Sequence, residues 1–362
     1  MSSQTTSQLF QPTQVGDIRL QHRVVLAPLT RLRADDQHVH TDLAVEYYAQ
    51  RASVPGTLLI SEATFIAMRA GGYPHVPGIW SPDQVKAWKK VTDAVHAKGS
   101  YIFCQLWALG RAAYPDYLGK FDLPLVSASD LPMPDSKNVP RPLTVEEIRE
   151  YVELYRQAAK NAIEAGFDGV EVHNANGYLL DQFVQDVSNK RTDDYGGSIE
   201  NRCRFGLEVV KAVTDAIGQK RTGIRFGPWE QFQGMRMAEP KPTFSYFVKT
   251  IRDTYPDFAY VHVTEPRIYV AYDREPEPGE SNDFIRDIWS PRPLITAGGY
   301  TRDLAMEVAD RTGDLVAFGR FFISNPDLPL RLMKDIPLNM YNRDTFYAQT
   351  GEGYIDYPFA EK

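Results

Sequence analysis

The segment Gly169-Val170-Glu171-Val172-His173-Asn174-Ala175-Asn176-Gly177-Tyr178 joins a short strand pattern to a dense group of polar side chains. Its first half, residues 169–173, has the β-branched character of a parallel strand that is covered on both faces. Its second half places an imidazole, a carboxamide and a phenol directly after that strand. In barrels of parallel strands the catalytic groups stand at this carboxyl end. The segment therefore predicts both the type of strand and the position of the chemistry.

Seven further segments share this short, nearly continuous apolar pattern, and helical patterns separate them from one another. They are residues 24–27, 58–63, 101–106, 222–226, 258–263, 294–297 and 315–318. Because eight strands alternate with helices, we expect one parallel sheet closed into a (β/α)8 TIM barrel. No linker or low-complexity tract interrupts the chain, so we expect residues 1–362 to form a single domain.

Several helix starts can be recognised in the sequence. Ser81-Pro82-Asp83-Gln84 and Thr144-Val145-Glu146-Glu147 each combine an N-cap residue with Gln or Glu three positions later, which predicts capping boxes. The second one precedes a long helix that we expect to end near Gly166. Ser198 and Thr301 are further candidate N-caps.

Three segments lie outside this alternation. Val15-Gly16-Asp17-Ile18 predicts a hairpin turn before the first strand, placed to close the base of the barrel. Residues 107–142, after strand 3, carry six prolines and predict an ordered lid region. Residues 264–281, after strand 6, form a second proline-containing insertion.

Composition excludes several classes of function. Hydrophobic residues make up 43% of the 362 residues, enough for a sizeable core, and the net charge is −7 without a basic run. We therefore expect no nucleic acid and no membrane among the partners. Two cysteines, Cys104 and Cys203, are too few for a disulfide framework, and residues 1–8 are too polar for a secretory signal. These features predict a soluble cytoplasmic protein.

The glycines after strands 7 and 8 predict an anion site. Gly298, Gly299 and Gly319 would let backbone N–H groups approach a phosphate where barrels commonly hold one. Arg320 could add a bidentate charged contact. The alternative is that the glycines serve tight turns and that Arg320 is a surface charge.

The polar residues after strand 4 predict acid–base chemistry. His173 and Asn176 could together donate hydrogen bonds to one oxygen, as in an oxyanion hole. Tyr178 stays protonated at neutral pH, because a phenol has an ordinary pKa of about 10, and can act as a proton donor. The alternative is a structural histidine and a helix-capping asparagine. The presence of all three groups at one rim favours the catalytic interpretation.

Other chemistries find less support in the sequence. Glu171 and His173 share one strand face, but no HExxH motif or closely spaced His/Cys cluster accompanies them, so we expect no metal. Residues 260–263 end without the lysine of a Schiff-base aldolase, and Cys104 fits the core better than a nucleophile role. No GxGxxG motif follows a strand, which argues against a Rossmann dinucleotide site.

Taken together, the chain resembles the Old Yellow Enzyme family of flavin-dependent ene-reductases nearly from end to end, over residues 9–347. The most specific matching motifs are Ala27-Pro28-Leu29-Thr30-Arg31, Gln105-Leu106-Trp107, residues 173–178 and 191–198, and Phe318-Gly319-Arg320.

The resemblance implies a tightly but non-covalently bound FMN across the barrel mouth. The residues that would face its isoalloxazine ring are Pro28, Thr30, Ala63 and Gln105. Those that would hold the ring edge, ribityl chain and phosphate are Arg225, Gly298, Gly299, Gly319 and Arg320. Thr30 would donate to a flavin carbonyl and so take part in catalysis.

The resemblance also implies a substrate site and an activity. His173 and Asn176 would bind the carbonyl or nitro oxygen of an activated alkene, Tyr178 would protonate its α-carbon, and Trp107 would complete the substrate site. The activity would be NADPH-dependent reduction of the C=C bond in α,β-unsaturated carbonyl or nitro compounds. NADPH, a transient hydride donor, would leave the same pocket before the alkene enters, which predicts ping-pong kinetics.

Two positions depart from the family pattern. Arg111 stands where several members carry an aromatic residue, and we expect it to affect substrate choice. Ala63 replaces a common glycine and should be tolerated. Three alternatives stay open: a flavin-dependent isomerase or secondary-metabolism enzyme, a phosphate-binding lyase or isomerase without flavin, and a binding barrel without activity. A homodimer stays open as well.

Overall fold

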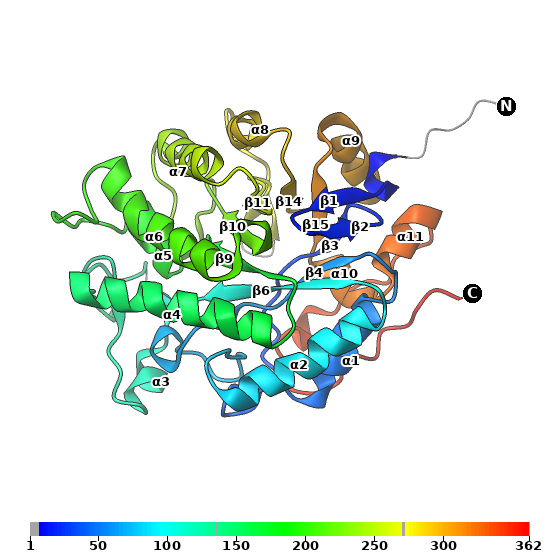
Figure 1. Ribbon diagram of the computed structural model, residues 1–362, viewed down its shortest axis with the longest axis horizontal. Helices are drawn as coiled ribbons and strands as arrows, with labels where there is room; N and C mark the ends of the chain where they lie inside the picture. Colours follow the sequence, from blue (N-terminus) through cyan, green and yellow to red (C-terminus); the bar gives the residue numbers. More distant parts are fainter. Residues whose placement is uncertain (1–6, 135, 270–271, 362) are drawn as a thin grey trace.

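Eight parallel strands form a closed barrel at the centre of the protein (Figure 1). The computed structural model describes residues 7–134, 136–269 and 272–361; residues 1–6 of the polar N-terminal segment lie outside it. The barrel strands are β3 (Val24–Leu26), β4 (Leu58–Ile60), β6 (Tyr101–Trp107), β9 (Gly169–Asn174), β10 (Thr222–Phe226), β11 (Tyr260–Thr264), β14 (Leu294–Ala297) and β15 (Leu315–Phe318). The parallel pairs β15–β3 and β4–β6 complete the ring, which confirms the predicted (β/α)8 barrel.

One predicted strand is divided in the structure. Residues 58–63 were expected to form one strand, but β4 ends at Ile60 and a separate β5 (Thr64–Phe65) pairs with the second half of β6. The Ser61 N–H still donates to the carbonyl oxygen of Phe103 on β6 at 2.8 Å, but side chains supply the next hydrogen bonds. The Glu62 N–H donates to the Tyr48 hydroxyl oxygen at 2.8 Å, and the Ser61 hydroxyl accepts from the Gln105 N–H at 3.0 Å.

Helices cover the outside of the barrel (Figure 1). They are α1 (Asp42–Arg51), α2 (Pro82–His96), α4 (Val145–Glu164), α6 (Ile199–Ile217), α7 (Pro240–Thr254), α8 (Asp283–Trp289), α9 (Arg302–Thr312) and α11 (Leu328–Lys334), with the shorter α3 (Pro115–Gly119), α5 (Leu179–Val184) and α10 (Arg320–Ser324). Both predicted capping boxes are confirmed, at Ser81 and at Thr144. Ser198 and Thr301 also cap their helices as predicted.

The predicted N-terminal hairpin packs under the barrel. Its strands, β1 (Thr13–Val15) and β2 (Ile18–Leu20), are antiparallel, and Val15 and Leu20 are fully buried in one apolar cluster with barrel residues such as Phe103. A Cβ atom on Gly16, whose φ is +53°, would lie only 1.9 Å from the carbonyl oxygen of Lys220, just before β10. Only glycine allows so close an approach, and the hairpin therefore closes the amino-terminal end of the barrel.

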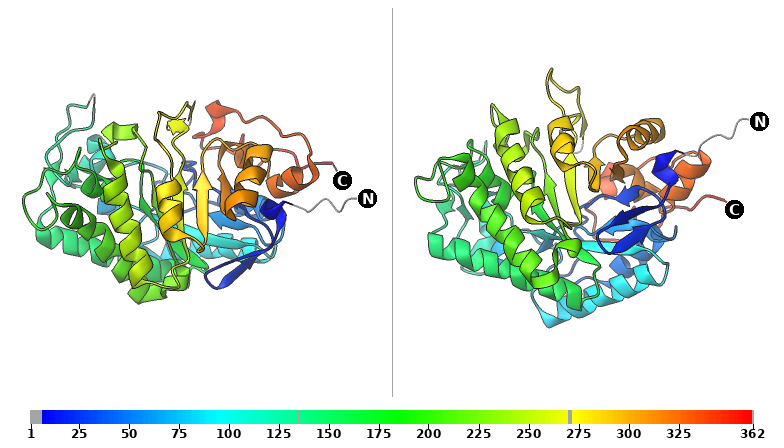
Figure 2. Two further views of the ribbon diagram at one scale, coloured as in Figure 1. Left: turned by 90° about the horizontal axis from the view of Figure 1, so that it is seen from above. Right: turned by 45° about the horizontal axis from the view of Figure 1, so that its top comes forward.

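Both predicted insertions have ordered elements of their own. The first contains η3 (Gly110–Ala112), α3, and the paired strands β7 (Val126–Ser127) and β8 (Arg141–Pro142). The second contains the antiparallel pair β12 (Ile268–Tyr269) and β13 (Tyr272–Asp273), and this yellow segment projects from the barrel in the right-hand view of Figure 2. The insertions follow the carboxyl ends of β6 and β11, so they extend the walls of the barrel mouth.

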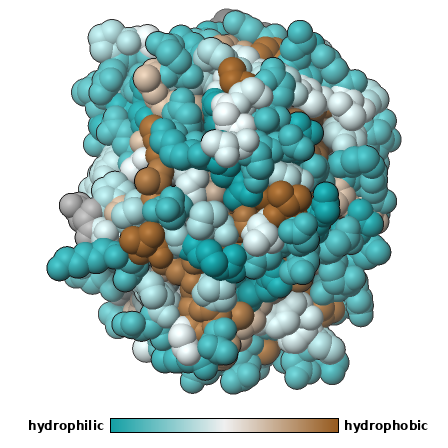
Figure 3. All heavy atoms as spheres, turned by 90° about the vertical axis from the view of Figure 1, so that its left-hand side faces the viewer, coloured by the Kyte–Doolittle hydropathy of each residue, from teal (hydrophilic) through white to brown (hydrophobic). Residues whose placement is uncertain are grey.

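The outer surface is largely hydrophilic on the face in Figure 3, where apolar atoms form small separated patches. Across the described ranges, every helix is too short or too polar to cross a membrane.

Candidate active site

The carboxyl ends of the barrel strands surround a cavity of about 680 Å³. This volume lies in the range of small-molecule and cofactor pockets. Every residue proposed for the site from the sequence lines it: Pro28, Thr30, Ala63, Gln105, Trp107, His173, Asn176, Tyr178, Arg225, Gly298, Gly299, Gly319 and Arg320. The structure thus brings together residues from seven of the eight barrel units, which are far apart in the sequence.

Three aromatic side chains of the site pack against one another. The ring centroids of Trp107 and Tyr178 are 4.7 Å apart in an edge-to-face arrangement, and those of His173 and Tyr178 are 5.2 Å apart. Trp107 also stacks on His173 at 6.2 Å. These contacts hold the imidazole and the phenol in fixed positions on one wall of the cavity.

Burial sets the protonation states of these two groups. It holds the pKa of His173 well below its ordinary value, and Arg225 and His262 act in the same direction. It raises the pKa of Tyr178, assisted by Tyr347. At neutral pH the site therefore presents a neutral imidazole and a protonated phenol. Within the described part of the chain, His173 Nδ1 is buried without a hydrogen-bond partner.

The turn between His173 and Tyr178 has a left-handed backbone. Asn176 and Gly177 have φ values of +59° and +74°. Gly177 N–H donates to Asp181 Oδ2 at 2.8 Å, which anchors the turn to α5. Asparagine and glycine are the residues that adopt this conformation at least cost. The turn brings Asn176 to the cavity, where its Nδ2 lies 3.4 Å from Glu230 Oε2.

A buried polar network lies beneath the cavity, inside the barrel. Glu171 accepts a hydrogen bond from Gln105 Nε2 at 2.7 Å and one from His262 Nδ1 at 2.8 Å. Burial favours the protonated carboxyl of Glu171, but His262, Arg225 and Gln105 together lower its pKa below the ordinary value. Because Glu171 engages the amide nitrogen of Gln105, the amide oxygen is left for the cavity. Among the described residues, Arg225 Nε is buried and unpaired.

The glycines after β14 form a turn that only small residues can occupy. Gly298 and Gly299 have φ values of +131° and +61°, and a Cβ on Gly298 would lie 2.9 Å from Ile268.

Arg320 lies beside this turn. Its Nη2 bonds to Asp273 at 2.6 Å, and its Nη1 bonds to the Tyr341 hydroxyl at 3.2 Å. The turn and the guanidinium face the same cavity, as the prediction of an anion site requires.

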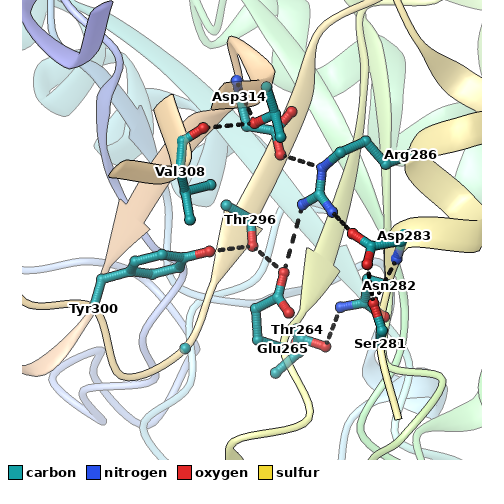
Figure 4. A network of polar contacts seen from close by, with 12 residues as sticks. Thr264, Glu265, Ser281, Asn282, Asp283, Arg286, Thr296, Tyr300, Val308 and Asp314 are labelled. Carbon is teal, nitrogen blue, oxygen red and sulfur yellow. Dashed lines mark hydrogen bonds and ion pairs between the residues drawn. The ribbon is translucent and has the colours of Figure 1, made fainter. Parts of the chain in front are cut away.

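A polar network holds this turn in place (Figure 4). Thr296 on β14 bonds to Glu265, after β11, at 2.6 Å and to the Tyr300 hydroxyl at 2.8 Å. Arg286 on α8 lies 3.7 Å from Glu265 and bonds to Asp314, before β15, at 2.6 Å. The network therefore connects three consecutive barrel units around the glycine turn.

Sequence reasoning missed the aromatic and acidic residues that complete the cavity wall. They include Tyr73, Tyr114, Phe232, Asp273, Tyr341 and Tyr347. They come from the loop between β5 and α2, from the two insertions, from the loop after β10 and from the C-terminal segment. The search for polar residues at strand ends does not reach such positions. The density of Tyr and Phe in segments outside the strands was the available signal.

Arg111 lies between two loops beside the cavity. Within the described chain it is not among the residues that line the cavity. Its guanidinium bonds to the carbonyl oxygens of Leu131 at 3.1 Å and Gln233 at 3.0 Å. Arg111 thus joins the insertion after β6 to the loop after β10, and any effect on substrate choice would act through these loops.

The comparisons with known proteins agree with this site. Residues 8–339 match the NADH:flavin oxidoreductase / NADH oxidase family. The NADP-dependent oxidoreductase lnbE of Aspergillus flavus is 50% identical, covering 98% of this chain and 97% of the relative. The chanoclavine-I aldehyde reductase fgaOx3 of Penicillium roqueforti is also 50% identical, with the same coverage of both chains.

The solved structures extend the same finding to the fold. The Old Yellow Enzyme from Pichia sp. AKU4542 superposes with a TM-score of 0.90 at 39% identity, over 98% of this chain and 94% of that chain. The Zymomonas mobilis homologue NCR gives the same score and identity, over 97% and 99%. The chain therefore belongs to the Old Yellow Enzyme family and is a flavin-dependent oxidoreductase.

Proposed function

We propose that the protein is an FMN-dependent NADPH oxidoreductase that reduces the C=C bond of α,β-unsaturated carbonyl or nitro compounds. The observation that carries the proposal is one cavity containing a neutral imidazole, a carboxamide and a protonated phenol beside a glycine turn and Arg320. The first three groups suit an enolate, and the last two suit a phosphate.

The residues present fit FMN. The glycine turn leaves space and backbone N–H groups for a phosphate, and Arg320 supplies a cation. Arg225 offers a buried Nε–H to the edge of the ring, and Gln105 offers an amide oxygen that Glu171 orients. Pro28, Thr30 and Ala63 would contact the ring itself. When bound, FMN would take a hydride from NADPH and pass it to the β-carbon of the alkene.

The chain's own residues would perform the rest of the reaction. His173 and Asn176 would hold the substrate oxygen and stabilise the negative charge that develops on it. The Tyr178 hydroxyl would then transfer its proton to the α-carbon. Trp107 would hold the imidazole and the phenol in position and line the substrate space. Since both substrates would use one cavity, the kinetics should be ping-pong.

The names of two relatives point to aldehydes among the carbonyl substrates. Two relatives at 50% and 48% identity are named as a chanoclavine-I aldehyde reductase and an aldehyde reductase. We extend the proposal to a conjugated aldehyde on a bulky apolar scaffold, because Tyr73, Tyr114, Phe232 and Tyr347 line the cavity. We also propose that residues 1–362 act as a single domain in the cytoplasm, since both cysteines are buried and unpaired.

A flavin-dependent isomerase is the second candidate. Relatives at 47–48% identity are named as probable inactive dehydrogenases, so this barrel also occurs in proteins without an assigned dehydrogenase activity. The two candidates differ in stoichiometry. A reductase consumes one NADPH for each alkene that it reduces. An isomerase takes its hydride back at the end of each cycle and therefore consumes no NADPH overall.

The purified protein should be yellow, and NADPH should bleach the flavin under anaerobic conditions. Addition of an unsaturated aldehyde should restore the colour and yield the saturated aldehyde with equimolar NADPH oxidation. A bleached protein that no enal, enone or nitroalkene reoxidises would contradict the proposal. Product formation without NADPH oxidation would favour the isomerase.

A further inference from the structure

We infer that Glu171 is a positioning residue that sets the hydrogen-bonding polarity of the cavity floor, with an acceptor at Gln105 and a donor at Arg225. The inference rests on the proposed function, in which a flavin ring contacts these two residues. Glu171 is fully buried inside the barrel, beneath the cavity. It acts through Gln105 and Arg225, which both line the cavity.

The strand register brings four side chains together inside the barrel. Gln105 on β6 is paired with Glu171 on β9, and Arg225 on β10 is paired with His262 on β11. A hydrogen bond of 2.8 Å from His262 Nδ1 to Glu171 Oε2 joins the two pairs, although β10 lies between their strands. Such contacts form because inward-facing side chains of a barrel pack together in its interior.

Glu171 first determines which end of the Gln105 amide faces the cavity. Its Oε1 accepts from Gln105 Nε2 at 2.7 Å. Burial raises the pKa of Glu171, but His262, Arg225 and Gln105 together hold it below the ordinary value, so the group is a carboxylate at neutral pH. A carboxylate only accepts hydrogen bonds, so it selects the amide nitrogen and turns the amide oxygen away from itself.

Glu171 also compensates the buried charge of Arg225. Burial lowers the pKa of Arg225, and the Glu171 carboxylate opposes this effect. Arg225 Nε is nevertheless buried without a partner among the described residues, so this N–H remains for a ligand. An acceptor beside a donor suits the pyrimidine end of oxidised flavin, which carries one ring N–H between two carbonyl groups.

The test changes the polarity of Glu171 and keeps its size. In Glu171→Gln, one amide oxygen faces two donors, Gln105 Nε2 and His262 Nδ1, so the Gln105 amide is no longer held in one orientation. The dissociation constant of FMN should rise roughly three- to tenfold, the range for one hydrogen bond. Fluorescence titration of FMN with the flavin-free full chain measures it. Glu208→Gln, the same change on the outer helix α6, is the matched control and should bind FMN as wild type does.

A flavin without the ring N–H separates polarity from structural support. FMN methylated at N3 cannot donate this hydrogen bond, so Glu171→Gln should bind it as tightly as wild type does. Equal weakening of FMN and of the N3-methyl derivative would mean that Glu171 only supports the barrel. That result would overturn the inference, and so would unchanged binding of FMN.

An exchange of the two side chains keeps the outcome decisive. In the double variant Gln105→Glu/Glu171→Gln, the carboxylate at position 105 accepts from the amide nitrogen at position 171 and retains an oxygen for the cavity. The amide oxygen at position 171 accepts from His262. Both acceptors are restored, so the double variant should recover most of the FMN affinity that Glu171→Gln loses. A double variant that binds FMN no better than Glu171→Gln would contradict the inference.

The same titrations distinguish this inference from the proposed function. If wild type and Glu171→Gln bind both flavins alike, only the role of Glu171 fails. If the wild-type protein binds FMN with the expected polarity but no alkene reoxidises the bleached protein, the proposed reaction fails and the role of Glu171 stands. If the wild-type protein does not bind FMN, both fail.

Discussion

Burial acts on two neighbouring side chains of the cavity with opposite chemical consequences. His173 is a base, so burial removes its proton at neutral pH, whereas Tyr178 is an acid and retains its own. The result is a pair of uncharged hydrogen-bond donors on one wall. Uncharged donors need no counter-ion before the reaction, and their stabilising effect grows when negative charge develops on the bound oxygen.

Replacement of His173 tests this property without turnover. His173→Ala should weaken the binding of phenolate ligands to the oxidised holoenzyme by roughly ten- to hundred-fold, because a hydrogen bond to a charged group contributes about 1.5–3 kcal/mol. Spectrophotometric titration of the bound flavin with a phenol measures the affinity. His96→Ala on the outer helix α2 is the control. Unchanged phenol affinity would mean that His173 does not bind the oxygen.

At the scale of elements, the strands and helix caps could be predicted because their signals are local. Buried parallel strands are short and apolar, and a capping box is a four-residue pattern; Thr144 and Glu147 form one as expected. The polar part of the site could also be predicted, because its residues directly follow the ends of the strands. The aromatic wall could not be predicted, because residues such as Tyr114 and Tyr347 reach the cavity through long loops. The position of Arg111, bonded to Gln233, likewise depends on two loops meeting.

The element that follows β15 carries the prediction for cofactor binding. Arg320→Ala should raise the dissociation constant of FMN from the apoprotein roughly ten- to hundred-fold, since a charged contact worth about 1.5–3 kcal/mol is lost. Riboflavin, which lacks the phosphate, should bind the variant and the wild type alike. Arg302→Ala at the start of α9 serves as control. A similar loss for both flavins would show that Arg320 supports the fold instead of the phosphate.

At the scale of the whole molecule, buried arginines join the first barrel unit to the C-terminal segment. Arg31 donates to the carbonyl oxygens of Phe346 at 3.0 Å and Gly353 at 2.9 Å. Arg51 donates to the carbonyl oxygen of Tyr354 at 3.1 Å.

Glu62 lies among these arginines and accepts a hydrogen bond from the Arg31 backbone N–H at 3.2 Å. Burial raises the pKa of Glu62 to about 7, against the opposing effect of the Arg31 backbone N–H and the Arg31 and Arg33 guanidinium groups.

This carboxyl should make the stability of the protein depend on pH. In the unfolded chain Glu62 ionises near the ordinary glutamate pKa of 4.5, whereas in the folded protein it ionises near 7. Between these values the folded state binds more protons, so the contribution of Glu62 to stability falls as pH rises. Glu62→Gln should therefore gain about 3 kcal/mol over wild type between pH 5 and pH 9. Urea unfolding measures it, with the exposed Glu46→Gln as control; a pH-independent difference would contradict the shifted pKa.

The β1–β2 hairpin has a consequence for turnover. Since Val15 and Leu20 fill the base of the barrel, the carboxyl-end mouth is the entrance that NADPH and the alkene would share. Excess alkene would then occupy the oxidised enzyme and keep NADPH out, while excess NADPH would occupy the reduced enzyme and keep the alkene out. The steady-state rate should pass through a maximum as either concentration rises. In a cell, such mutual substrate inhibition would make the flux depend on the ratio of the two reactants.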